Sequence, residues 1–249
     1  MPELTSFANS GPYRTHSSQR PKSRFMNPLI VVTGGTKGIG RAIADQFVAN
    51  GFDAVVCARS VDTVRGPHLL PFAADLSVRS GVDALIAYVE SLKRPVDVLV
   101  NNTGAFQPGQ IHNETEGTFE QLMNTNVGSA YHLTRGLVRD MMIRRQGHIF
   151  MMCSTASITP YTNGGSYCIS KFALLGMSRV LREELKPHDV KVTAILPGAT
   201  LTASRTGTDL PEERFMKPQD VADSVWMAHS LSKSAVVEEI LIRPQLGDI

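Results

Sequence analysis

The sequence has few of the features that mark a membrane protein, an extracellular protein or a nucleic-acid-binding protein. Its longest apolar runs are no longer than a strand, so none is expected to span a membrane. Its formal net charge is only +2, with acids and bases interspersed, and this offers no basic surface for nucleic acid. The three cysteines are scattered without metal-ligand spacing: Cys57, Cys153 and Cys168. They are expected to be small buried side chains in a reducing compartment, the cytoplasm, and no metal site is expected.

The sequence instead contains strand-like segments that alternate with helix-like segments. Strands are expected at 29–33, 53–58, 69–74, 96–101, 147–153, 191–196 and 236–242, and helices at 39–50, 79–93, 117–144, 165–186 and 218–231. This alternation predicts a parallel sheet with helices on both faces, and 249 residues suffice for one such α/β domain. Residues 59–68 are too few for a full crossover helix, so we expect a loop or a single turn there.

A glycine-rich turn follows the first expected strand. Leu29–Thr33 leads into Gly34-Gly-Thr-Lys-Gly38-Ile-Gly40 and then into a helical segment that ends at Gly51. Strand, glycine turn and helix are the context that a dinucleotide-binding motif requires, because glycines let the backbone approach a pyrophosphate at the helix N-terminus. The segment is not a phosphate-binding loop of the nucleotide triphosphatase type, since Lys37 is not preceded by Gly-x4-Gly.

A second pattern, Ser-x12-Tyr-x3-Lys, provides candidate catalytic residues. Tyr167 and Lys171 are four residues apart, so on a helix they share one face. A phenol with a pKa of about 10 becomes a useful proton donor or acceptor near neutrality when a neighbouring cation favours its anion. Ser154 ends an apolar strand-like run, which would place its hydroxyl opposite the phenol with room for one carbonyl oxygen. A Tyr-x3-Lys pair alone is commonly a solvated helix edge, but the upstream glycine turn favours the catalytic interpretation.

With these motifs the chain resembles the short-chain dehydrogenase/reductase family. The motifs occur in order: Thr33-Gly-x3-Gly-Ile-Gly40, Asn101-Asn-Thr-Gly104, Asn126, Ser154, Tyr167-x3-Lys171 and Pro197-Gly198. The resemblance covers residues 28 to about 243 and implies a single doubly wound Rossmann domain with a seven-stranded, mostly parallel sheet. It also implies nicotinamide-dependent oxidoreduction. Thr103 departs from the family's usual Asn-Asn-Ala-Gly.

The resemblance also implies a role for each motif residue. Tyr167 would pass a proton to a substrate carbonyl oxygen as hydride arrives at the carbon, and Ser154 would polarise that oxygen. Lys171 would lower the phenol pKa and bind the nicotinamide ribose, and Asn126 would hold a water that passes protons to Lys171. The expected cofactor contacts are Gly34, Thr36, Lys37, Gly38, Ile39, Gly40, Arg59, Asp75, Leu76, Asn102, Gly104, Tyr167, Lys171, Pro197, Gly198, Thr200 and Thr202.

Charge near the second expected strand favours NADP(H) over NAD(H). An NAD enzyme of this architecture places an acid about twenty residues after the glycine turn to bind the ribose 2′-hydroxyl. That position is Ala58, and Arg59 follows it, with Lys37 as a second cation in the glycine turn. A guanidinium can grip a 2′-phosphate, although both bases could also be ordinary surface residues. Asp75 matches the family's adenine-binding acid, and it or Ser77 could instead cap the following helix.

The substrate is expected to be a small carbonyl compound or the matching alcohol, of unspecified class. Candidate pocket residues are Ala105, Phe106, Ser157, Tyr161, Asn163 and a lid loop at 201–217. A cofactor-binding sensor or scaffold with little catalysis is the alternative function. An epimerase or dehydratase of the extended relatives is a third one, disfavoured by the glycine spacing.

Two further expectations concern the ends of the fold and its assembly. Residues 1–25 are rich in Ser, Pro and Arg, with Glu3 as the single acid, and could be a disordered tail, a transit peptide or a segment before a true start at Met26. Helices 117–144 and 165–186 carry apolar residues in excess of one sheet face, which predicts a homodimer or homotetramer. The residues concerned are Phe119, Leu122, Met123, Tyr131, Leu137, Met141, Leu174, Leu175, Met177 and Leu181.

Overall fold

The computed structural model describes residues 26–202 and 209–248. Within these ranges seven strands form one parallel sheet in the order β3-β2-β1-β4-β5-β6-β7. They are β1 (Leu29–Thr33), β2 (Asp53–Ala58), β3 (Leu69–Ala73), β4 (Val98–Asn101), β5 (Gly147–Met152), β6 (Val190–Pro197) and β7 (Glu239–Ile242). The strand order reverses between β1 and β4 at the centre of the sheet. In such folds ligands bind outside the carboxyl ends of the strands at this reversal.

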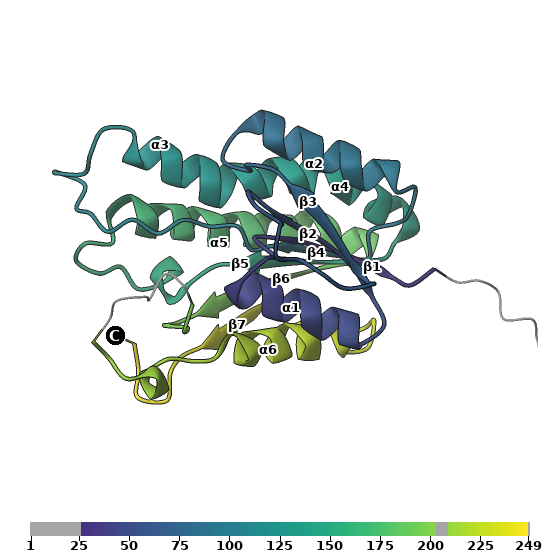
Figure 1. Ribbon diagram of the computed structural model, residues 1–249. Coiled ribbons are helices and arrows are strands. Elements are labelled where there is room, and N and C mark those ends of the chain that lie inside the picture. The colour runs from purple at the N-terminus through teal and green to yellow at the C-terminus, as the bar shows by residue number, and fades with distance from the viewer. Residues whose placement is uncertain (1–25, 203–208, 249) are drawn as a thin grey trace, which may run out of the picture.

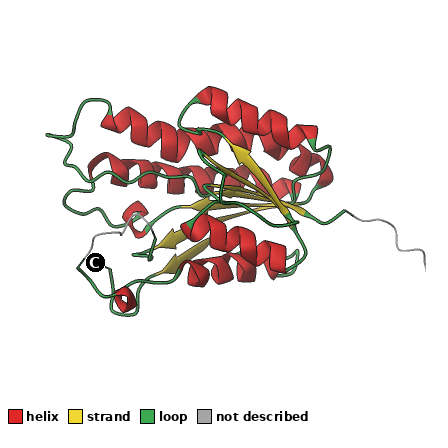
Figure 2. Cartoon of the chain, in the orientation of Figure 1, coloured by secondary structure: helices red, strands yellow, loops and turns green. Residues whose placement is uncertain are grey.

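Helices cover both faces of the sheet (Figure 1). Helices α1 (Gly38–Ala49) and α6 (Pro218–Ser230) pack on one face, and α2 (Arg79–Ser91), α4 (Ser129–Arg144) and α5 (Gly165–Leu185) pack on the other. Successive residues of β1 alternate between two apolar clusters: Val31 belongs to the α2/α4/α5 side, whereas Ile30 and Val32 belong to the α1/α6 side. The expected doubly wound α/β fold is therefore confirmed (Figure 2).

The helix expected at 117–144 is interrupted. It consists of α3 (Thr118–Met123), a π-helical turn at Asn124–Gly128 and α4. A π-turn inserts one residue into the helical repeat and is common at functional sites. Hydrophobic periodicity could not reveal it, because the apolar residues on either side still follow a helical spacing.

The other element boundaries lie within about two residues of the expected ones, the usual ambiguity at element ends. The exception is β7, which begins at Glu239 rather than at residue 236. The connection between β2 and β3 contains only turns, as expected for residues 59–68. Short 3₁₀ turns occur at Thr155–Ser157, Lys186–His188 and Glu212–Arg214.

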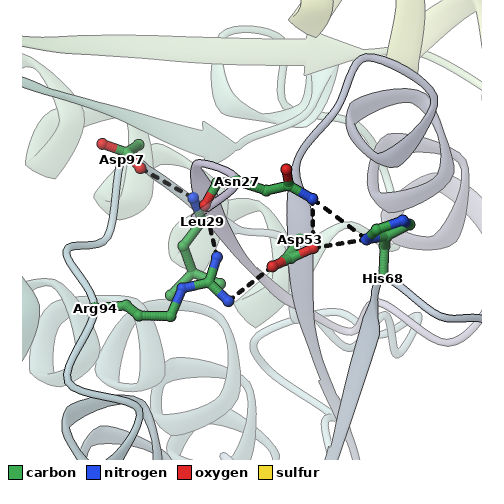
Figure 3. A network of polar contacts seen from close by, with 6 residues as sticks. All are labelled: Asn27, Leu29, Asp53, His68, Arg94 and Asp97. Carbon is green, nitrogen blue, oxygen red and sulfur yellow. Dashed lines mark hydrogen bonds and ion pairs between the residues drawn. The ribbon is translucent and has the colours of Figure 1, made fainter. Parts of the chain in front are cut away.

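A polar network joins the amino ends of several strands, at the edge of the sheet opposite their carboxyl ends (Figure 3). Asp53, at the start of β2, accepts a hydrogen bond from Asn27 (3.0 Å) and pairs with Arg94 (2.8 Å). Burial raises the pKa of Asp53, but hydrogen bonds from its neighbours outweigh that effect and hold the pKa below its ordinary value. The six residues in the view are Asn27, Leu29, Asp53, His68, Arg94 and Asp97.

The apolar excess expected on α3, α4 and α5 is only partly exposed. Of the ten side chains named above, five are buried within the single chain: Leu122, Leu137, Met141, Leu174 and Leu175. Leu137, Met141, Leu174 and Leu175 belong to the apolar cluster on the α2/α4/α5 side of the sheet. The exposed apolar side chains of these helices include Phe119, Tyr131, Ile143, Ile169, Phe172 and Val180.

Some sequence-based expectations fall outside the described ranges or concern membranes and metals. Residues 1–25, the expected tail, and residues 203–208 of the expected lid are not described. No helix in the described ranges is long and apolar enough to cross a bilayer. Nor do those ranges contain a group of three or more His, Cys, Asp or Glu side chains that could hold a metal ion.

Candidate active site

The glycine turn after β1 has little room for side chains. Gly34 and Gly38 have φ angles of 62° and 56°, in the left-handed region that favours glycine. A Cβ on Gly40 would run into the carbonyl oxygen of Gly34 and the side-chain amide of Asn102. The turn therefore packs tightly against the start of α1 and leaves its outer side free for a ligand.

Asn102 and Thr33 hold this turn against the end of β4. The Asn102 side-chain amide donates to the carbonyl oxygens of Thr33 (2.8 Å) and Gly34 (3.2 Å). The Thr33 hydroxyl oxygen accepts from the backbone N–H groups of Asn102 and Thr103, both at 2.9 Å. Asn102 thus fixes the shape of the turn as well as lining the cavity beside it.

A cavity of about 820 Å³ extends along the carboxyl edge of the sheet from the glycine turn to the ends of β2 and β3. It brings together most of the residues expected to bind a cofactor: Gly34, Thr36, Lys37, Gly38, Ile39, Gly40, Arg59, Asp75, Leu76, Asn102, Gly104 and Thr202. Thr103, Ser60 and Thr63 also line it. Ser60 and Thr63 were not expected, although their position just after the end of β2 could have indicated them.

Charged side chains concentrate at the β2 end of this cavity. The side chains of Lys37 and Arg59 are exposed beside it. Asp75 accepts hydrogen bonds from the backbone N–H (2.9 Å) and the hydroxyl (2.7 Å) of Ser77, and these lower the pKa of its carboxyl group. Neither Asp75 nor Ser77 caps α2, because the N-cap position is Val78, without a side-chain cap bond. The capping alternative is therefore wrong.

A second cavity, of about 460 Å³, lies beside the first at the ends of β5 and β6. Ser154, Tyr167, Lys171, Pro197, Gly198, Thr200 and Thr202 line it, together with the expected pocket residues Ala105, Phe106 and Tyr161. The two cavities share six lining residues and so open into each other: Ile39, Asn102, Gly104, Ala105, Phe106 and Thr202. We refer to them as the cofactor cavity and the reaction cavity.

Lys171 and Tyr167 lie together on α5, as the four-residue spacing predicts. The Lys171 ammonium group donates to the Met152 carbonyl oxygen at the end of β5 (2.8 Å) and lies 5.8 Å from the centre of the Tyr167 ring. Lys171 is only 6% exposed, so this cation is held in place beside the phenol. Phe106 meets the Tyr167 ring edge to face, with 4.9 Å between ring centres.

Ser154 lies at the end of β5, where the 3₁₀ turn begins. Its hydroxyl oxygen accepts from the backbone N–H of Ala156 (3.1 Å), and its own N–H donates to the hydroxyl oxygen of Ser157 (3.1 Å). Ser157 is therefore a buried capping residue, only 1% exposed. It was expected to line the substrate pocket, but it does not line the reaction cavity. Asn163 does not line the reaction cavity either, contrary to expectation, and instead lines another pocket together with Phe172.

Asn126 supports the site from behind. Its side-chain oxygen accepts from the backbone N–H of Ala105 (2.7 Å), and its amide donates to the Ala105 carbonyl (3.0 Å) and the Ser170 hydroxyl (2.8 Å). The π-turn carries this 1%-exposed side chain into the gap between α5 and the segment after β4. The side chain lines neither cavity, so its direct effect is to fix Ala105 and α5 relative to each other.

Comparison with known proteins identifies the family. The family model for short chain dehydrogenases matches residues 28–212, more than half of the chain. The chain belongs to the short chain dehydrogenase family. It is 31% identical over 241 residues to a sepiapterin reductase of Chlorobaculum tepidum, covering 90% of this chain and 99% of that protein.

Two other comparisons cover nearly the whole domain. An NADP-dependent 3-hydroxy acid dehydrogenase of Salmonella typhi is 28% identical over 239 residues, covering 87% of this chain and 94% of the relative. The crystal structure of a metagenomic short-chain oxidoreductase in complex with NADP is 30% identical, with a TM-score of 0.77, covering 88% and 97% of the two chains. The fold of this short chain dehydrogenase is thus shared with relatives that it covers over nearly their whole length.

The expected lid of this short chain dehydrogenase is anchored at its far end. Phe215 and Met216 are 7% and 6% exposed, and the Met216 N–H donates to the Ala199 carbonyl (3.0 Å). The Leu201 N–H donates back to the Met216 carbonyl (2.8 Å). These bonds hold Leu201 and Met216, which lie near the two ends of the expected lid, beside each other.

Cys153 and Asp248 line the reaction cavity although neither was expected there. Burial raises the pKa of the Cys153 thiol to about 11, so this cysteine lines the cavity as an unreactive side chain. All three cysteines are buried, as predicted. Asp248, which follows β7, also lines the cavity, and no motif in the sequence indicated it.

Proposed function

We propose that this short chain dehydrogenase is an NADP(H)-dependent oxidoreductase that reduces a ketone or aldehyde, or oxidises the matching secondary alcohol. The observation that carries the proposal is the meeting of Ser154, Tyr167 and Lys171 in one cavity. That cavity opens into a second one bordered by the glycine turn. A proton-transfer group and a dinucleotide cradle are thus side by side.

The residues present fit a dinucleotide. The tight turn at Gly34, Gly38 and Gly40 leaves backbone and the α1 N-terminus facing the cofactor cavity, which suits a pyrophosphate. Ala58 stands where an NAD enzyme has an acid, and Arg59 and Lys37 supply cations for a 2′-phosphate. One relative described above is named as NADP-dependent, and one similar structure is described as a complex with NADP; both support NADP(H) as the cofactor.

The chemistry follows from the groups around the carbonyl position. The cofactor supplies or accepts the hydride when it is bound. Tyr167 gives its phenolic proton to the substrate oxygen, and the adjacent Lys171 ammonium stabilises the phenolate that remains. Ser154 donates a hydrogen bond to the same oxygen and stabilises the charge that develops there. Asn126 bonds to Ala105 in the wall of the cavity and to Ser170 on α5, and so holds the two in a fixed relative position.

We also propose that the protein acts as a homodimer or homotetramer in a reducing compartment such as the cytoplasm, with residues 26–249 as one domain. The exposed apolar residues Ile169, Phe172 and Val180 lie along α5, and Tyr131 and Ile143 lie on α4. A row of this kind supports two-fold pairing of these helices. Family resemblance favours the tetramer.

The test is NADPH oxidation in the presence of a panel of ketones and aldehydes. We expect turnover with part of the panel, and a Tyr167→Phe variant should lose at least about 10²-fold in kcat, the usual contribution of a positioned general acid. NADPH affinity should change little, because the phenol contributes to the reaction more than to binding. A variant that keeps its kcat within about threefold at saturating substrate would contradict the assignment of Tyr167. Cofactor binding with no turnover across the panel would favour a sensor or scaffold.

A further inference from the structure

The segment after β7 turns back toward the reaction cavity and delivers Asp248 to it. The Gly198 N–H at the end of β6 donates to the Ile242 carbonyl at the end of β7 (2.8 Å). The Gly247 N–H then donates to the Pro244 carbonyl (2.8 Å), and Gly247 has a φ of 84°. This turn reverses the chain, so that the Asp248 side chain lies over Gly198.

The position of the carboxylate depends on the lack of a side chain at Gly198. A Cβ built on Gly198 would run into the Asp248 Oδ1 atom. The other oxygen, Oδ2, is 3.4 Å from the Arg243 Nε atom, and the Asp248 side chain is 36% exposed. Arg243 does not line the reaction cavity, whereas Asp248 does. The charge presented to the cavity by this segment is therefore negative.

Asp248 lines the reaction cavity, in which a substrate and the nicotinamide would meet, and it does not line the cofactor cavity. Among the described residues that line the reaction cavity, the charged ones are Lys171 and Asp248. Lys171 is committed to the Met152 carbonyl and the Tyr167 ring. An anionic substrate would thus meet Asp248 without a dedicated cationic partner among these residues.

We infer that Asp248 is a specificity-determining residue that favours carbonyl substrates bearing a cationic or hydrogen-bond-donating nitrogen and disfavours carboxylates. The inference rests on the proposed function, since it names the substrate class of the same cavity. Phe106 and Tyr161 are 49% and 46% exposed and line the same cavity with aromatic rings. A ring with a donor nitrogen would use both features, because a carboxylate accepts charge-assisted hydrogen bonds and repels other carboxylates.

The test uses three benzaldehydes that differ only in the para substituent: dimethylaminomethyl (cationic), isopropyl (neutral) and carboxylate (anionic). The wild type should show a higher kcat/KM for the cationic than for the anionic aldehyde. In Asp248→Asn this ratio should fall by about fivefold to tenfold, as expected for loss of a half-exposed charge-assisted contact. Asp248→Lys should reverse the preference. Arg243→Gln and the exposed α6 variant Asp223→Asn are controls that should keep the wild-type order.

A binding measurement separates this inference from the proposed function. Titration of the NADP⁺-loaded protein with N,N-dimethylbenzylamine and with benzoate, followed by ligand NMR, requires no turnover. If no ketone or aldehyde of the whole panel is reduced but the amine binds more tightly than benzoate only while Asp248 is present, the inference holds and the proposed function fails. If the aldehydes are reduced with the same ratio in wild type and Asp248→Asn, the inference is overturned and the proposed function stands. Equal binding of the two probes to both proteins would also overturn it.

Discussion

Glu114 accepts a hydrogen bond from the backbone N–H of Ser166 (2.8 Å) and a second one from the Ser166 hydroxyl. Ser166 lies in the first turn of α5, directly before Tyr167, and Glu114 lies in the long segment between β4 and α3. The first N–H groups of a helix have no partner within it, and the N-terminus favours a negative charge. The carboxylate therefore joins the segment that carries Phe106 to the start of the helix that carries the phenol.

Replacing Glu114 with Ala should lower both stability and turnover. We expect a loss of about 0.5–2 kcal/mol in the free energy of unfolding, the usual effect of removing a helix cap. The kcat for carbonyl reduction should fall while NADPH affinity is kept, because the start of α5 loses its tie. Urea unfolding and steady-state kinetics measure the two effects. Glu116→Ala, at an exposed neighbouring position, is the control, and equal effects of both variants would contradict the role of Glu114.

Arg59→Ala should weaken NADPH binding far more than NADH binding. Only NADPH carries the 2′-phosphate that Arg59 is proposed to grip, and such a contact contributes roughly 1.5–3 kcal/mol, or about 10- to 150-fold in affinity. Fluorescence titration of both cofactors measures the difference. Arg65→Ala is a matched control, because Arg65 is exposed in the same connection but does not line the cofactor cavity. Equal losses for the two cofactors would leave Lys37 as the sole basis for the preference.

The proposed oligomer predicts a light-scattering mass of two or four chains at micromolar concentration. Val180→Glu, on the exposed side of α5, should reduce that mass, since it places a charge within the apolar row. Met227→Glu, on α6 and similarly exposed, should leave it unchanged. A monomer mass for the wild type would mean that the row on α4 and α5 has another role.

His148 occupies a buried position on β5, where a second proton on the imidazole ring is unfavourable. Its Nε2 lies 2.8 Å from the Thr193 hydroxyl, which itself donates to the Val237 carbonyl (2.5 Å). Nε2 is thereby assigned as the donor, and Nδ1, which has no hydrogen-bond partner, as the unprotonated nitrogen. Burial, and then the nearby His229 and Lys191, hold the pKa of His148 well below its ordinary value. Burial lowers the pKa of His229 as well.

These depressed pKa values predict a loss of stability in mild acid. Below about pH 6.5 the unfolded chain binds protons that the folded chain does not, so stability falls with decreasing pH by up to about 1.4 kcal/mol per unit for each histidine. Thermal unfolding between pH 7.5 and pH 5.5 measures this fall. His148→Gln, which can still donate to Thr193, should show a smaller fall than the wild type. An identical pH dependence in the variant would assign the effect to other groups.

The sequence predicts the parts of this molecule that repeat along the chain or fall into ordered motifs. Apolar periodicity predicts the strands and helices. The four-residue spacing predicts that Tyr167 and Lys171 lie on one face of a helix, because four residues make about one helical turn. The sequence could not predict that the Ser157 side chain points inward and caps Ser154, because a serine is equally compatible with either side of a 3₁₀ turn. The position of Asp248 could not be predicted for a different reason. The turn at Gly247 and the end of β6 bring it to the reaction cavity, and sequence spacing does not reveal that these two segments are close in space.

The helix-free connection between β2 and β3 leaves the β3 edge of the sheet easier to open than its centre. All five residues of β1 are buried, whereas β3, among the described residues, pairs with β2 alone and has one buried residue, Leu69. Amide hydrogens in regions with little apolar contact exchange by local opening, so those of β3 should take up deuterium well before those of β1. Arg59 and Asp75 flank the same edge of the cofactor cavity. A dinucleotide that bridges them would slow deuterium uptake in β3, and β3 would thereby report cofactor occupancy in the absence of any substrate.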